Sequence, residues 1–167
     1  MSQPVPDPPG TPIPVLTSAR RLLTDAEINA VRMTILGNNY GMNPDTAGQI
    51  LEEALAFVAT AAASPGEGLV PSRVVDEGWH ALILHTGTYY GLCARVGNFV
   101  HHIPEQPDPG RWDQTVIDRT LDAIQATGYP VHPTLWLGPE DSTVPVAASC
   151  QHGDQSGPIV IIPKPKG

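Results

Sequence analysis

Residues 72–95, SRVVDEGWHALILHTGTYYGLCAR, contain no proline, although the 167-residue chain has 19 prolines. Ser72 is a residue type that caps helix N-termini, so the stretch predicts one helix from Arg73 to about Arg95. Three glycines in it each weaken a helix by up to about 1 kcal/mol: Gly78, Gly87 and Gly91. We therefore expect this helix to depend on packing against the rest of the protein.

The predicted helix has an apolar side and a flank that carries an acid and a histidine. At about 100° per residue, one broad side collects the residues expected to face the core: Val75, Trp79, Leu82, Thr86, Tyr89, Tyr90 and Cys93. Asp76 and His80 lie about 40° apart on the flank of that side, and Gly87 and Gly91 leave room beside them. His85 points about 140° away from His80, so we expect it on the surface.

Asp76 and His80 are residue types that bind transition metals, and two further histidines follow the helix. His101 and His102 belong to the short extended run Asn98–Ile103, in which successive side chains point to opposite sides. Only one of them can reach Asp76, and we expect His102. One carboxylate and two imidazoles are typical of Fe(II) sites with open positions, and zinc accepts the same ligands. The sequence therefore predicts a divalent metal, Fe or Zn, held by Asp76, His80 and His102.

The same residues have a purely structural interpretation. An acid in the first helical turn is favoured by the helix dipole, and Asp76 with His80 would form a local ion pair worth about 0.5 kcal/mol. Under the metal hypothesis, Tyr89 or Tyr90 is the catalytic phenol that orients a substrate, and Trp79 shields the pocket from water. Under the structural hypothesis, these three aromatic residues pack in the core with their polar ends bonded.

The rest of the chain predicts three further helices between proline-rich ends. Thr24 and Glu27 form a capping box that begins a helix ending near Gly37, and Asn43 caps a second helix from Pro44 to about Ala63. A last helix follows Asp113 and ends at Gly128. We expect an all-α fold: a small four-helix orthogonal or bundle-like domain over residues 18–137, with largely irregular tails at 1–17 and 138–167. Only Ile159–Ile162 in these tails has strand character, and prolines on both sides limit it.

Composition excludes several classes of function. The net charge of −8, with no basic cluster beyond Arg20 and Arg21, argues against nucleic-acid or anionic-membrane binding. No signal peptide or membrane span is evident, so we expect a soluble cytoplasmic protein. Cys93 is expected to be a small buried residue, and His132 an exposed turn residue. Cys150 and His152 supply too few ligands for a metal site of their own.

A string in the predicted helix resembles the helical motif of the glycine-rich domain-containing protein family, of which short stand-alone versions occur in bacteria. The string is V-D-x-x-W-H-x-x-x-L-H-x-x-x-Y, formed by Val75, Asp76, Trp79, His80, Leu84, His85 and Tyr89. The resemblance implies that the polar residues among these act together. The chain departs from the family at Leu82, where the motif often has a second histidine, and it lacks the glycine-rich segment. If His85 shares a site with His80, the helix must break near Gly87; otherwise His85 contacts a partner chain.

Two functions fit this sequence. The first is a metal-dependent enzyme that acts on a peptide or small metabolite. The alternative is a non-catalytic protein–protein interaction module whose proline-rich tails bind a protein partner.

Overall fold

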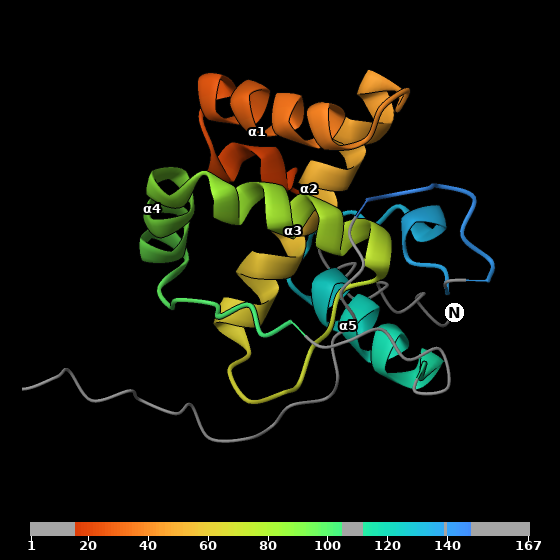
Figure 1. Cartoon of the computed structure of the whole chain (residues 1–167). Helices are drawn as coiled ribbons and strands as arrows, with labels where there is room; N and C mark the ends of the chain where they lie inside the picture. Colours follow the sequence, from red (N-terminus) through yellow and green to blue (C-terminus); the bar gives the residue numbers. More distant parts are fainter. Residues whose placement is uncertain (1–15, 105–111, 139, 148–167) are drawn as a thin grey trace, which may run out of the picture.

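The computed structural model describes residues 16–104, 112–138 and 140–147, and all regular structure in these residues is helical (Figure 1). The all-α prediction is confirmed. Five α-helices and two 3₁₀ helices follow one another along the described chain: η1 (Ala19–Leu22), α1 (Asp25–Asn38), α2 (Pro44–Ala63), α3 (Arg73–Leu84), α4 (Thr86–Val96), α5 (Gln114–Ala126) and η3 (Pro133–Leu135).

The predicted helix starts are confirmed by their caps. The Thr24 side chain accepts a hydrogen bond from the Glu27 amide, and the Glu27 carboxylate accepts one from the Thr24 amide, which is a complete capping box. Asn43, Ser72 and Asp113 each accept a hydrogen bond from a backbone amide in the first turn of α2, α3 and α5.

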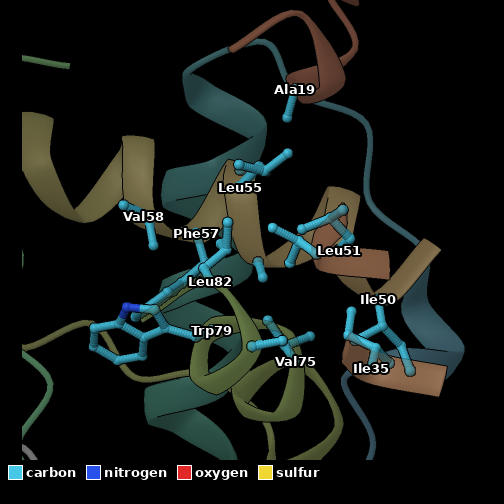
Figure 2. Close-up of a cluster of buried hydrophobic side chains, with 14 of the residues drawn as sticks. Ala19, Ile35, Ile50, Leu51, Leu55, Phe57, Val58, Val75, Trp79 and Leu82 are labelled. Atoms are coloured by element: carbon cyan, nitrogen blue, oxygen red, sulfur yellow. The ribbon is translucent and has the colours of Figure 1, made fainter. Parts of the chain in front are cut away.

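Helix α2 is the centre of the fold. It packs against η1, α1, α3, α4 and α5, and the other helices surround it in Figure 1. Twelve of its 20 residues are buried, so it contributes apolar side chains in several directions. Figure 2 shows the resulting cluster, in which Ile50 of α2 lies beside Ile35 of α1, and Phe57 of α2 lies beside Trp79 of α3. The Phe57 and Trp79 rings pack edge to face, with centroids 5.1 Å apart.

Gly78 allows α3 to lie directly against α2. A Cβ atom at this position would meet the Ile50 carbonyl oxygen at 2.8 Å and the Ala54 Cβ at 2.9 Å. Both distances are shorter than van der Waals contact, so a larger residue would force the helices apart. The glycine that weakens the helix in isolation is therefore required by its packing.

The prediction of one helix from Arg73 to Arg95 is wrong, because the chain breaks at His85. Helix α3 ends at Leu84 and α4 begins at Thr86, in a different direction (Figure 1). His85 has φ −87° and ψ 69°, outside the helical region. Its ring lies 2.7 Å from the Thr34 hydroxyl on α1, a contact across 51 positions that helical periodicity does not report. The half-buried His85 is thus neither a simple surface residue nor part of a site with His80.

Residues 140–147, which the sequence assigns to the C-terminal tail, contact the helical body. Val144 and Val146 pack against its core, and the Ala147 amide donates a hydrogen bond to Asn39. Residues 1–15 and 148–167 lie outside the described residues, and with them the predictions for Cys150, His152 and Ile159–Ile162. Within the described ranges, no helix has the length and apolar character needed to cross a membrane.

Candidate metal centre

Asp76 lies in the first turn of α3 with its side chain buried. Its Oδ1 atom is 3.0 Å from Nε2 of His102, and its Oδ2 atom is 3.4 Å from Nε2 of His80. His80 is one helical turn after Asp76, whereas His102 comes from the segment that follows α4. The structure therefore brings the three predicted ligands together around one carboxylate.

Asp76, His80 and His102 lie close enough together that they could hold a metal ion. One ligand atom from each of Asp76, His80 and His102 can be chosen so that all lie within 4.8 Å of one another. Two donor atoms each about 2.1 Å from the same ion are about 3.0–3.4 Å apart at usual coordination angles. Side-chain exposure is 1% for Asp76, 10% for His102 and 27% for His80. The acid is thus internal, His102 is largely covered, and His80 is the most exposed of the three side chains.

The segment after α4 delivers His102 to the site. Gly97, with φ 95°, ends α4, and Asn98 then donates a hydrogen bond to the Ala62 carbonyl at the end of α2. The chain runs back towards α3 without regular structure, and the His102 ring packs 4.6 Å from that of Trp79. This path fixes the imidazole against α3.

His101 points elsewhere, as strand-like alternation predicts. It is exposed, its ring centroid lies 4.8 Å from that of Phe99, and it is not one of the three residues that could hold a metal. The expected choice between the two adjacent histidines is therefore seen in the structure. That His102 binds a metal stays a prediction.

Tyr89 connects α3, α4 and the segment that carries His102. Its buried hydroxyl accepts a hydrogen bond from the Trp79 indole at 3.0 Å and donates one to the Val100 carbonyl, two residues before His102. Burial raises the pKa of Tyr89 well above its ordinary value of 10.0, so the phenol stays protonated. Tyr90, in contrast, is 71% exposed. A role for either tyrosine in orienting substrate remains a prediction.

Two surface hollows meet at the cluster, and both are lined by Ile83 and His102. The first, of about 680 Å³, is lined also by Asn38, Glu77, His80, Leu84, Pro104 and Ala147. The second, of about 600 Å³, is lined also by Thr86, Gly87, Tyr89, Tyr90, Phe99, Val100 and His101. A ligand in either hollow would therefore lie beside a candidate metal ligand.

Sequence reasoning missed Glu77 as a residue of this site. It is 2% exposed, and its carboxylate accepts a hydrogen bond from the Asn39 side chain at 2.8 Å. The side-chain oxygen of Asn39, Oδ1, in turn accepts a hydrogen bond from the Ala147 amide at 2.7 Å. An acid beside Asp76 was the only local signal. Its burial depends on residues 38 or more positions away, which periodicity does not report.

A second buried acid, Glu53 of α2, fixes the segment after α5. It accepts hydrogen bonds from the His132 amide at 2.6 Å, from His132 Nδ1 at 2.8 Å and from the Trp136 indole at 2.7 Å. The His132 side chain is 37% exposed, as a turn residue would be, but its ring is bound to this acid. Cys93 is buried, as expected. Neither His132 nor Cys93 belongs to the candidate metal centre of Asp76, His80 and His102.

The chain matches the model of one protein family. The model of the UCP032817-like family matches residues 20–116, which is more than half of the chain. The protein belongs to the UCP032817-like family. The matched range contains α1 to α4 and all three residues of the candidate metal centre, so the site lies within the part that defines a UCP032817-like protein.

The resemblance to the glycine-rich domain-containing family is wrong, because the family match is to the UCP032817-like model. The resemblance rested on a short string in residues 75–89, and the structure splits this string between α3 and α4. No curated protein and no solved structure matches the chain. The UCP032817-like description names no reaction.

Proposed function

We propose that this protein is a metal-dependent enzyme that acts on a small metabolite or peptide. One observation carries the proposal: the imidazoles of His102 and His80 lie 3.0 and 3.4 Å from the oxygens of the buried Asp76 carboxylate, beside two surface hollows. Carboxylate and imidazole are ligands of Fe(II) and zinc.

A purely structural carboxylate–imidazole pair is the competing explanation. Glu53 shows what such a pair looks like in this protein: one imidazole, a backbone amide and an indole donate hydrogen bonds to its oxygens. Asp76 instead faces two imidazoles from separate elements, with ring centroids 4.4 Å apart. The convergence of two histidines on one acid at a hollow supports metal binding over a fold-stabilising contact.

Three protein ligands leave coordination positions open for water or substrate. A bound divalent ion would polarise a substrate oxygen or lower the pKa of a bound water. Around it, Trp79 excludes water from the inner side of His102, and Tyr89 holds the backbone of the His102 segment. Glu77 lines the same hollow as His80, where Asn39 holds its carboxylate in place. We assign Glu77 the role of accepting a proton during the reaction.

Metal analysis tests the proposal. Full-length protein purified without chelator or histidine tag should contain about one Fe or Zn per chain. His80→Ala should lose this metal, because it removes one of three ligands, whereas His101→Ala should retain it, because His101 lies outside the cluster. Metal well below one equivalent in the wild type, with no change in His80→Ala, would refute a metal centre.

A non-catalytic interaction module is the second candidate, and exposed apolar side chains favour it. Leu84, Tyr90, Phe99 and Ile103 are each about half exposed or more. Leu84 and Tyr90 line the two hollows, so a protein partner could cover this face. In this case the protein would hold no metal, and Leu84→Ser combined with Tyr90→Ser would weaken partner binding, which can be followed by quantitative cross-linking in cells.

A further inference from the structure

We infer that the ligand of this protein has two parts: oxygen donors that bind the metal, and an apolar, preferably aromatic, group. The apolar group binds in the hollow between α4 and the segment that carries His102. The inference rests on the proposed metal centre and names the class of molecule that the centre accepts. Four observations carry it: the charge and the shape of the lining, the space at Gly87, and the position of His102.

The lining of this hollow is uncharged apart from its histidines. Apart from Gly87 and the histidines, its residues are aliphatic or aromatic or carry a neutral hydroxyl (Thr86, Tyr89 and Tyr90), and no Asp, Glu, Lys or Arg contributes. The neighbouring hollow differs, because Glu77 lines it. A charged substituent would lose hydration here without gaining a partner, whereas a hydrocarbon ring would gain from burial.

Aromatic side chains stand at this hollow although solvent reaches them. Tyr90 is 71% exposed and Phe99 is 49% exposed, and both contribute to the lining. The Phe99 ring packs edge to face on Tyr89, with centroids 5.5 Å apart, so it is held in place. Aromatic walls of this kind suit a flat apolar group. The volume of about 600 Å³ exceeds the roughly 150 Å³ that suffices for benzene in a closed cavity.

Gly87 leaves space in the lining that the fold itself does not require. A Cβ atom at Gly87 would meet nothing within 4 Å, and its backbone is helical with no positive φ. Packing and backbone geometry would both accept a larger residue, which would also favour the helix by up to about 1 kcal/mol. Glycine here keeps the hollow open.

His102 connects the hollow to the metal centre. It lines the hollow while its Nε2 atom faces Asp76. A ring in the hollow would therefore lie next to a group that is coordinated at an open position of the metal. This geometry describes a small molecule with oxygen donors and an adjacent aromatic ring.

Two hydroxamates test the inference, because both chelate divalent metals through two oxygens and only one carries a ring. Full-length protein loaded with Co²⁺ is titrated separately with benzohydroxamate and with acetohydroxamate. The visible absorption spectrum of the bound Co²⁺ reports binding. Wild-type protein should bind benzohydroxamate at least about tenfold more tightly. Gly87→Leu places a side chain in the hollow and narrows it, so it should weaken benzohydroxamate about tenfold and leave acetohydroxamate within about twofold.

Gly37→Leu is the matched control, because Gly37 is also a helical glycine with nothing near its Cβ position but does not line the hollow. It should bind both hydroxamates as the wild type does. Equal affinity for the two compounds in the wild type, or an equal loss of both in Gly87→Leu, would overturn the inference while leaving the metal centre intact. Failure of the wild type to bind Co²⁺ would instead overturn the metal centre itself, and this inference with it.

Discussion

Asp76 Oδ1 and His102 Nε2 lie 3.0 Å apart, although 26 positions separate the two residues in the sequence. The contact exists because α3 ends at Leu84, α4 turns away, and the chain after Gly97 returns along α3. A continuous helix through His85 would carry residues 98–104 farther from Asp76. The break in the predicted helix is therefore what completes the candidate metal centre.

Loss of the Asp76 carboxylate should remove the metal and spare the fold. Asp76→Asn keeps the shape of the side chain and can still bond the two imidazoles, but it no longer supplies an anionic ligand. We expect metal affinity to fall by about 100-fold or more, with circular dichroism unchanged. Asp113→Asn, a cap of α5 away from the cluster, serves as the control and should leave metal affinity unaltered. Equal metal binding by Asp76→Asn and the wild type would argue for a merely structural acid.

Tyr89 should influence metal binding through the position of His102. Tyr89→Phe removes the hydroxyl that joins Trp79 to the Val100 carbonyl, so the Trp79 indole and the Val100 carbonyl each lose this hydrogen bond. We expect about 1–3 kcal/mol lower unfolding free energy and about tenfold weaker metal affinity, as for other residues that orient ligands. Tyr90→Phe is the neighbouring control, since Tyr90 is exposed, and should change neither quantity. Urea unfolding of the metal-free protein and Zn²⁺ titration measure the two effects separately. An unchanged affinity in Tyr89→Phe would limit Tyr89 to a structural role.

Gly78 should be intolerant of even one added carbon. Gly78→Ala places a Cβ atom 2.8 Å from the Ile50 carbonyl oxygen, so α2 and α3 must separate. We expect about 1–3 kcal/mol lower unfolding free energy, despite the better helix propensity of alanine. Gly37→Ala, at a position with open space, should be neutral or stabilising by up to about 1 kcal/mol. Chemical unfolding measures the free energy of unfolding of both variants. Similar values for Gly78→Ala and Gly37→Ala would show that the α2–α3 contact is looser than the structure indicates.

The cap of α1 should make stability sensitive to acid. The hydrogen bond from the Thr24 backbone amide lowers the pKa of Glu27 below its ordinary 4.5, and Arg95 acts in the same direction. Because the folded pKa is depressed, this contribution is present above pH 4.5 and is lost as pH falls through the folded value. Glu27→Gln keeps a hydrogen-bond acceptor without the charge, so it should be about 0.3–1 kcal/mol less stable at neutral pH. The difference should vanish in acid, and a gap that persists there would contradict the charge effect.

Much of the fold follows from local signals in the sequence. Caps such as Thr24 with Glu27 act within one helical turn, so the sequence alone locates the helix starts. The pairing of Asp76 with His80 follows from helical spacing, and the choice of His102 over His101 follows from alternation in an extended segment. Each of these signals spans only a few residues.

The contacts that sequence reasoning missed join distant parts of the chain. His85 leaves the helix where its ring meets Thr34, and the buried Glu77 accepts a hydrogen bond from Asn39, the residue that follows α1. The bonds from Glu53 to His132 and Trp136 span 79 and 83 positions. Periodicity describes one element at a time, so it predicts which face of a helix is buried but not which polar partner it meets there.

The most direct measurement of the central claim is X-ray absorption spectroscopy of the full-length protein loaded with one equivalent of Zn²⁺. If Asp76, His80 and His102 hold the ion, the spectrum will show two imidazole nitrogens at about 2.0–2.1 Å together with oxygen ligands, and one imidazole will disappear in His102→Ala. A spectrum with no imidazole ligand, or one identical in His102→Ala and the wild type, would contradict the claim.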